Sequence, residues 1–163
     1  MLKYFLALFL LVVIYNQVVE SSKCTCIKKI CGRGWNLKRG RCYRLFRHHR
    51  TWGQAFFNCW RKGGYLVRIN NRKEFLVVRN MARHFWIDGK RACYKNKRSF
   101  TFALGTRKFQ RPYTSFPKGE PDNHRGMDNC LQITRRSMDD TRCGTKMKYV
   151  CEKAPKLSLS KKL

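Results

Sequence analysis

Nine cysteines constrain the fold of this 163-residue chain more than any other feature of its sequence. They are Cys24, Cys26, Cys31, Cys42, Cys59, Cys93, Cys130, Cys143 and Cys151. In an oxidising compartment, so many cysteines indicate a disulfide framework rather than reactive thiols. Because their number is odd, at least one is free or pairs with another chain. The spacing of Cys24-Thr25-Cys26 does not match a structural zinc site.

Residues 1–22 predict a cleaved signal peptide. Lys3 supplies a short positive segment, residues 4–15 form an apolar run, and small and polar residues follow at 19–22. This order is typical of a secretory signal, and the apolar run is too short to span a bilayer comfortably. A signal anchor is the alternative. We expect a secreted, extracellular protein of one domain with no membrane span.

The charge of the chain is extreme. Lys and Arg number 37 against nine Asp and Glu, which gives a formal net charge of +28. Such a protein is attracted to polyanions, including sulfated glycans, bacterial envelopes and acidic matrix proteins. Nucleic acid shares this chemistry but is the partner that we least expect. The alternative is a protein that is simply soluble and basic.

Local patterns predict two helices. Thr51 and Gln54 form a capping box that begins the first helix, and the glycines at 63–64 end it. Asn71 with Glu74 is the N-terminal signature of the second. Apolar residues recur at helical spacing after both signatures.

The remaining segments predict short strands and a long irregular region. Strands are expected at residues 42–46, 65–69, 85–87, 131–133 and 148–151. Residues 31–42 suggest a small hairpin closed by its own disulfide. Residues 88–129 show little periodicity, and long irregular stretches inside a compact domain are usually functional. Residues 23–30 form a basic lead-in, and the Lys- and Ser-rich tail at 154–163 predicts disorder.

Acidic residues gather in one part of this basic chain. Nine are present, and Glu20 lies in the predicted signal peptide, which leaves eight. Five of the eight are Glu120, Asp122, Asp128, Asp139 and Asp140. Calcium prefers such oxygen ligands from flexible loops, whereas transition metals favour His or Cys, and only His124 is near. A solvated salt-bridge network is the alternative. A cis bond before Pro121 would turn the flanking carboxylates to the same side, although a trans bond is the other option.

Several motifs occur in an order that resembles the C-type lectin domain. They are Phe85-Trp86-Ile87, Glu120-Pro121-Asp122, Asp128-Asn129-Cys130, Met138-Asp139-Asp140 and Tyr149-Val150-Cys151-Glu152-Lys153. The resemblance covers residues 31–153 and implies an α+β fold, in which two helices flank small antiparallel sheets beside a long calcium- and sugar-binding loop region. It also implies the disulfides Cys31–Cys42, Cys59–Cys151 and Cys130–Cys143. Of the remaining cysteines, either Cys24 or Cys26 would pair with Cys93, and the other would be free or would link two chains into a dimer.

The resemblance implies a lectin with one calcium ion whose open positions accept two vicinal sugar hydroxyls. By position, its ligands would be Glu120, Asp122, Asp128, Asp139 and Asp140. The first four would also hydrogen-bond the sugar, and His124 lies where family members place a side chain against the sugar ring. An ordinary surface histidine is the alternative for His124.

The sequence departs from the family pattern at several positions. The Glu120-Pro121-Asp122 motif is a hybrid of the mannose-type Glu-Pro-Asn and the galactose-type Gln-Pro-Asp, so the sugar preference stays open. Further departures are Asp128 for Glu, Asp139 for Asn, Met138 for Trp and Asp88 for Gly. The loop after Asp88 carries Lys90, Arg91, Lys95, Lys97 and Arg98, so we expect a second calcium site to be absent.

Three functions compete at this stage. The first is a calcium-dependent lectin for mannose- or galactose-type glycans. The second is an extracellular matrix or biomineral protein that binds polyanions, because residues 113–123 are similar to the loop of perlucin-type shell-matrix lectins. The third is a cationic lectin of innate defence that acts on microbial surfaces. We expect no enzyme, because the four histidines show no nucleophile–base arrangement.

Overall fold

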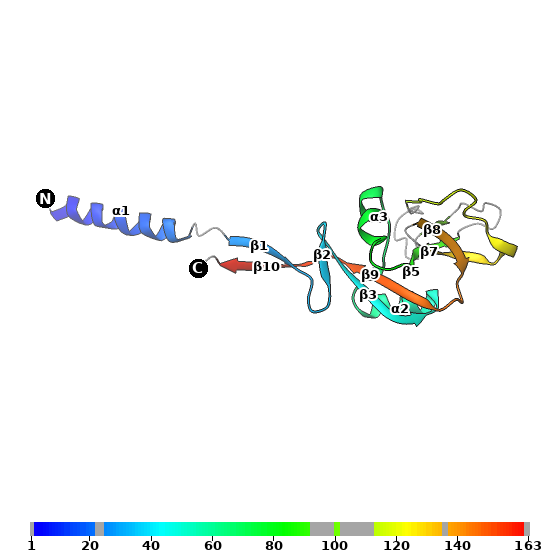
Figure 1. The fold of residues 1–163 in the computed structure, drawn as a ribbon. Helices are drawn as coiled ribbons and strands as arrows, with labels where there is room; N and C mark the ends of the chain where they lie inside the picture. Colours follow the sequence, from blue (N-terminus) through cyan, green and yellow to red (C-terminus); the bar gives the residue numbers. More distant parts are fainter. Residues whose placement is uncertain (1, 22–24, 92–99, 102–112, 135–136, 162–163) are drawn as a thin grey trace. The chain divides into compact units, whose positions relative to one another are not determined.

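The computed structural model describes residues 2–21, 25–91, 100–101, 113–134 and 137–161 (Figure 1). The chain divides into two compact units. The first contains residues 1–30 and 156–163, and the second contains residues 31–155.

The first unit consists of one helix and a two-stranded ribbon. Helix α1 (Leu2–Ser21) covers the predicted signal peptide. Strand β1 (Thr25–Ile30) pairs antiparallel with β10 (Lys156–Lys161), so the predicted disorder of the tail is wrong for these six residues. The alternation of Leu157 and Leu159 with polar residues has the period of a strand, a signal that the Lys and Ser content obscured. Within the part of the chain that the structure describes, no helix is long and apolar enough to cross a membrane.

The second unit is built on one sheet with the strand order β2-β3-β9-β5-β7-β8. The strands are β2 (Asn36–Lys38), β3 (Arg41–Arg50), β5 (His84–Arg91), β7 (Asp128–Thr134), β8 (Ser137–Arg142) and β9 (Met147–Lys153). Short β4 (Tyr65–Leu66) pairs with β9, and β6 (Phe100–Thr101) pairs with β5. Only β5 and β9 pair in parallel among these strands.

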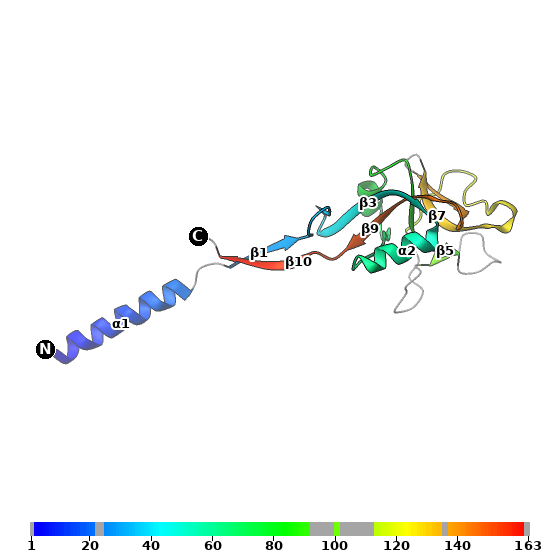
Figure 2. The same cartoon turned by 90° about the horizontal axis from the view of Figure 1, so that it is seen from below.

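Two helices flank this sheet, as the resemblance implies. Helix α2 (Trp52–Arg61) begins at the predicted capping box, in which the Thr51 side chain accepts from the Gln54 amide. Helix α3 (Arg72–Val78) begins at Asn71, whose side chain accepts from the Glu74 amide. Figures 1 and 2 show the two helices on opposite sides of strands β3 and β9.

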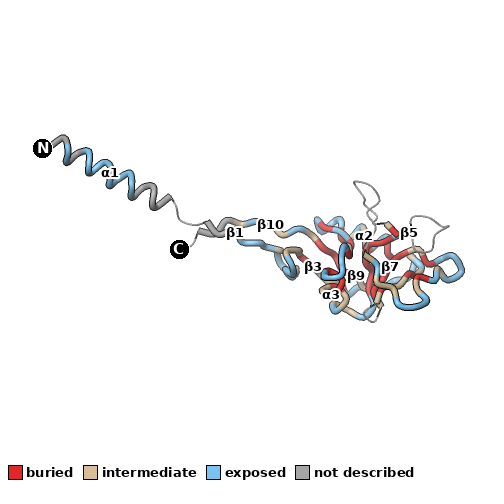
Figure 3. Tube along the Cα trace, turned by 90° about the horizontal axis from the view of Figure 1, so that it is seen from above, coloured by how far each residue is buried: buried red, intermediate tan, exposed pale blue. Residues whose placement is uncertain are grey.

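Buried residues gather along the central strands, including β3, β5, β7 and β9 (Figure 3). The largest fully buried residues include Trp86, Tyr43, Tyr149 and Phe85. Burial of a large apolar side chain contributes roughly 1.5–3 kcal/mol relative to exposure. The buried indole of Trp86 also has a polar partner, because its N–H donates to the Arg50 carbonyl at 2.8 Å. The hydrophobic core therefore fixes β5, β7 and β9, on which the candidate site depends.

All three disulfides that the resemblance implies are present. They are Cys31–Cys42, Cys59–Cys151 and Cys130–Cys143. The second joins α2 to β9 across 92 residues of sequence, and loops of this length gain most from a cross-link in the chain-entropy description. The predicted pairing of Cys24, Cys26 and Cys93 lies outside the described residues and side chains.

A buried polar network lies beneath the β2–β3 hairpin and the start of α3. Glu152 is fully buried, and its carboxylate accepts from the Arg41 side chain at 3.1 Å and from the Arg68 amide at 3.3 Å. Asp88, which replaces a glycine of the family pattern, is also buried and pairs with the Arg68 guanidinium at 3.0 Å. The ion pair explains how a carboxylate is tolerated at that position.

Candidate metal and sugar site

The acidic residues gather at the β8 edge of the sheet. Asp128 begins β7, whereas Asp139 and Asp140 lie on β8 opposite Gln132 and Leu131 of β7. We expected all five carboxylates on loops, and that expectation is wrong for these three, which lie on strands. Because side chains alternate along a strand, Asp140 shares the inward face with Met138, and Asp139 lies on the other face.

The loop before η1 (His124–Gly126) brings two further carboxylates to this edge. The Glu120–Pro121 bond is cis, as predicted. The Asp122 amide donates to the Glu120 carboxylate at 3.0 Å. The Asn123 amide donates to Asp140 Oδ2 at 3.1 Å, which ties the loop to β8.

Three of the five predicted ligands converge. One carboxylate oxygen from each of Glu120, Asp122 and Asp140 lies within 4.8 Å of the others. Asp122 is exposed, Glu120 is half-buried, and Asp140 is only 4% exposed. The second oxygen of Asp140, Oδ1, is buried and has no hydrogen-bond partner in the described part of the chain. A buried unpartnered carboxylate oxygen is costly and indicates that the arrangement suits a ligand of opposite charge.

Asp139 and Asp128 lie at the border of this group. Burial, the charge of Glu120 and a hydrogen bond with Glu120 together raise the pKa of Asp139 to about 7. Burial also raises the pKa of Asp128, with a contribution from the Asp122 charge. These shifts place Asp139 beside Glu120 and Asp128 near Asp122, although neither completes the convergent group.

Arg91 is the site residue that the sequence did not predict. Its Nη2 atom donates to Asp140 Oδ2 and to the Asp128 carbonyl oxygen, the latter at 2.7 Å. The two side chains of the Arg91–Asp140 pair are 1% and 0% exposed. The guanidinium carbon also lies 4.6 Å from the centre of the Phe100 ring. In the sequence, Arg91 was one basic residue among several, and no local pattern shows that it pairs with a carboxylate 49 positions later.

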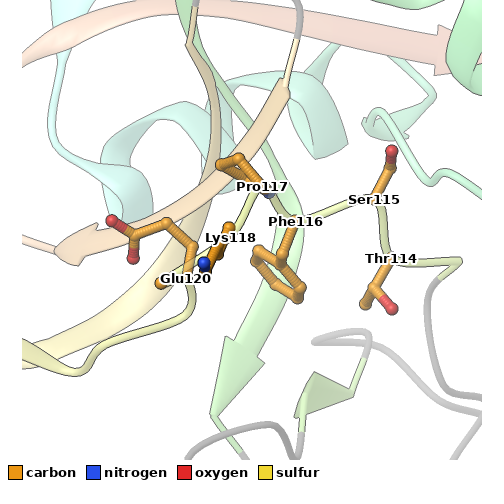
Figure 4. Close-up of a pocket in the computed structure, with 7 residues that line it drawn as sticks. Thr114, Ser115, Phe116, Pro117, Lys118 and Glu120 are labelled. Atoms are coloured by element: carbon orange, nitrogen blue, oxygen red, sulfur yellow. The ribbon is translucent and has the colours of Figure 1, made fainter.

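His124 and the loop that precedes the acids border the site on its open side. His124 is exposed, and its amide donates to Asp122 Oδ1 at 2.9 Å. Residues Thr114–Glu120 line a pocket of about 480 Å³ (Figure 4). The Glu120 carboxylate points away from the Phe116 ring in this view. The pocket therefore adjoins the acidic group without containing all of it.

The family of the chain follows from comparison with known proteins. A family model, the Lectin C-type domain, matches residues 48–153. The chain belongs to the C-type lectin family. The C-type lectin-like fold implied by the resemblance is thereby confirmed, and solved C-type lectin structures superpose on it.

The C-type lectin relatives carry diverse names. The galactose-specific lectin nattectin of Thalassophryne nattereri is 29% identical over 132 residues, which cover 76% of this chain and 80% of nattectin. A type-2 ice-structuring protein of Brachyopsis segaliensis is 30% identical over 129 residues, 77% of this chain and 73% of the relative.

Solved structures show the same diversity. A calcium-independent type II antifreeze protein matches with a TM-score of 0.68 at 28% identity, and the match covers 79% of this chain and 98% of that one. The carbohydrate-recognition domain of cow CD23 matches with a TM-score of 0.67 at 22% identity, covering 78% and 98%, and supports the fold alone. Family membership therefore leaves the use of calcium to be argued from this site.

The residues of this C-type lectin fit a calcium ion. The convergent group offers only oxygen ligands, which calcium prefers, and one of its carboxylates, that of Asp140, has a buried oxygen without a hydrogen-bond partner among the described residues. The exposure of Asp122 keeps the group accessible from solvent. Arg91 occupies the other oxygen of Asp140, so that side chain would offer the ion one oxygen rather than two. The expected absence of a second calcium site rests mainly on Lys95, Lys97 and Arg98, which lie outside the described residues.

Proposed function

We propose that this protein is a secreted lectin that binds sugar hydroxyls through one calcium ion held by Glu120, Asp122 and Asp140. The observation that carries the proposal is the convergence of one oxygen from each within 4.8 Å, together with the buried Oδ1 of Asp140, which has no hydrogen-bond partner among the described residues. Asp128 and Asp139 border the same group, and we propose them as further ligands on its margin.

The side chains around the ion would make different contacts with the ion and with the sugar. Calcium, when bound, supplies coordination positions that vicinal sugar hydroxyls can fill. Glu120 and Asp122, which are the more exposed carboxylates, accept hydrogen bonds from those hydroxyls. Arg91 and the Asn123 amide hold Oδ2 of Asp140 and leave Oδ1 for the ion. His124 lies beside Asp122 and would pack against the sugar ring.

The sugar itself belongs to the mannose or galactose type. Nattectin is named as galactose-specific, but the hybrid Glu120-Pro121-Asp122 motif of this chain matches neither type completely. A glycan array probed with and without calcium distinguishes the two classes. Binding that persists equally in EDTA would contradict the proposed mechanism.

Calcium titration tests the site directly. Isothermal titration calorimetry of the wild-type protein should detect one ion, with a dissociation constant on the order of 10⁻⁴–10⁻³ M, as in other extracellular modules. Asp140→Asn should weaken calcium binding by at least about 100-fold, because even residues that only orient ligands cost 10–100-fold. Lys118→Gln is the matched control, since Lys118 is exposed on the loop that carries Glu120 and offers no ligand oxygen. No heat and no melting shift for the wild type would refute the proposal.

We also propose that residues 1–22 are removed during secretion. The apolar run at residues 4–15 lies within α1, which matches the helical form of a signal sequence. Amino-terminal sequencing of protein secreted by eukaryotic cells should find a mature end at residue 22 or 23. Retention of Met1 on a membrane-bound product would favour a signal anchor instead.

The net charge of +28 supports a second candidate function, the binding of polyanions. The partner would be an acidic matrix, a biomineral surface or a microbial envelope. Retention on a heparin column that persists in EDTA and falls with salt would support this function. Agglutination of bacteria would favour a role in defence over a role in a matrix.

A further inference from the structure

A second concave site lies at the other edge of the sheet, between the β2–β3 hairpin and the first turn of α3. Strand β2 is at one end of the strand order and β8 is at the opposite end, so this pocket is separate from the acidic group. It has a volume of about 270 Å³. Its lining residues are Arg39, Arg41, Tyr43, Asn70, Asn71, Lys73 and Glu74.

Three cations with unused hydrogen-bond donors line this pocket. Arg39 and Lys73 are exposed, and neither forms an ion pair or side-chain hydrogen bond with any residue that the structure describes. Arg41 uses its Nε atom to pair with Glu152 at 3.1 Å, and its side chain remains 42% exposed. Its two Nη groups donate to no described residue. The pocket therefore presents the charged ends of three side chains to solvent.

The acidic residue of the pocket does not cancel this charge at the surface. Glu74 is 7% exposed, and both of its carboxylate oxygens are occupied by donors from within the protein. Tyr43 donates to one oxygen at 2.9 Å, and the amide and side chain of Asn70 donate to the other at 3.0 and 2.8 Å. Asn71 accepts from the Glu74 amide through Oδ1, which leaves its side-chain NH₂ group as a further donor.

We propose that this pocket binds a sugar residue that carries a sulfate or phosphate ester, without the help of calcium. A tetrahedral oxyanion accepts several hydrogen bonds at once, which matches the guanidinium and ammonium donors of Arg39, Arg41 and Lys73. The volume is slightly below the usual range for drug-sized ligands, so it suits one charged sugar residue rather than a longer segment. Single-stranded nucleic acid fits less well, because Tyr43 is the one aromatic residue of the lining and is only 2% exposed, which leaves no ring on which a base can stack.

The test compares two double variants that lose the same charge. Arg39→Gln/Lys73→Gln removes the two unpaired cations of the pocket and leaves the Arg41–Glu152 pair intact. Arg61→Gln/Lys146→Gln removes one exposed arginine and one exposed lysine elsewhere. The binding of a heparin-derived sulfated disaccharide is measured by calorimetry on the full secreted protein in EDTA. The pocket variant should bind about tenfold more weakly than the wild type, whereas the control should change by less than about twofold.

A second measurement locates the ligand on the surface. Lysine acetylation followed by mass spectrometry should show protection of Lys73, but not of Lys146, when the disaccharide is present. Repeating both measurements with glucosamine 6-phosphate separates a phosphate ester from a sulfate ester as the preferred group. Equal losses in the two variants, or equal acetylation of the two lysines, would show that the disaccharide responds only to net charge and would overturn the proposal. Because every measurement is made in EDTA, failure of the calcium site would leave these outcomes unchanged.

Discussion

The two edges of the central sheet carry opposite local charge in a protein whose net charge is +28. At the β8 edge, carboxylates converge around a buried oxygen without a partner, and Arg91 partly balances them. At the β2 edge, exposed cations without partners surround a carboxylate whose hydrogen bonds are already satisfied. Net charge alone predicts only the second of these regions. The comparison shows that the total charge does not identify where a cationic or an anionic ligand is expected. The burial of charged side chains and their missing hydrogen-bond partners identify these places better.

The two edges also differ in how much their charged side chains contribute to the stability of the fold. Asp140 of the acidic group is held on β8 by a buried ion pair, so a change there should alter both stability and binding. Arg39 and Lys73 of the β2 edge lie on an exposed turn and an exposed helical turn, so a change at these two residues should alter binding alone.

The largest expected effect is the loss of the buried cation. Arg91→Met leaves Asp140 as a buried charge without its ion pair, and breaking such a pair costs about 3–5 kcal/mol of the free energy of unfolding. Urea denaturation measures this loss, and calcium should recover part of it. Lys90→Met, on the exposed neighbour of the same strand, should change the free energy by less than about 0.5 kcal/mol. A similar small change for both variants would mean that Arg91 does not hold this edge together.

The next effect concerns pH and the polar network below the cationic edge. Burial raises the pKa of Glu152 to about 7, while Arg41 opposes the rise. Between the usual glutamate value and pH 7, the folded protein keeps a proton that the unfolded chain has released. The free energy of unfolding therefore falls as the pH rises through this range, by at most about 1.4 kcal/mol per pH unit for this group.

Glu152→Gln tests this dependence, because glutamine retains an acceptor for Arg41 but cannot titrate. The free energy of unfolding is measured by denaturation at several pH values, from about pH 5 to about pH 8. Its dependence on pH should become flatter in this variant. Lys118→Gln removes an exposed charge from another part of the chain and should leave the slope as it is in the wild type. An unchanged slope in Glu152→Gln would show that the carboxylate stays ionised across this range.

A smaller effect on stability is expected at the cationic edge. Arg39→Gln/Lys73→Gln removes exposed side chains without partners among the described residues, so the free energy of unfolding should change by less than about 0.5 kcal/mol. Urea denaturation under the conditions used for Arg91→Met allows the two edges to be compared directly. A loss of several kcal/mol would mean that these cations contribute to the fold, and that the two edges do not differ in their contribution to stability.

The smallest expected effect is the coupling between the edges. The two sites share no residue, and sites of this kind act independently unless two conformations link them. Saturating calcium should therefore change the dissociation constant of the sulfated disaccharide by less than about twofold. A larger change would show that the sheet transmits a signal between its edges.

Much of this architecture could be predicted because its signals are local. The Thr51 cap, the Asn71 cap and the cis bond before Pro121 each depend on residues within a few positions of one another. The family motifs then supplied the disulfides, which local patterns could not pair beyond the first hairpin. The acidic group was visible as a cluster in sequence for the same reason.

The remaining features depend on contacts between distant segments. The ion pair of Arg91 with Asp140 forms only when β5 and β8 approach β7 from opposite sides, and the cationic pocket joins residues 39–43 to residues 70–74. Asp139 and Asp140 were expected on a loop because flexible loops commonly supply calcium ligands, but in the fold they pair with β7. Strand β10 was missed because its partner, β1, lies more than a hundred residues earlier.

The antiparallel pairing of Thr25 with Lys161 places the start of the proposed processed chain directly opposite its carboxyl-terminal strand. A linker of a few residues would therefore suffice to close the backbone into a ring. New termini could then be opened at the exposed turn around Gly144, between β8 and β9. The permuted chain would keep all six cysteines that form the three disulfides. Such a permuted protein would keep the same sheet, but both of its chain ends would lie beside Cys143. A reporter could therefore be attached next to strand β8.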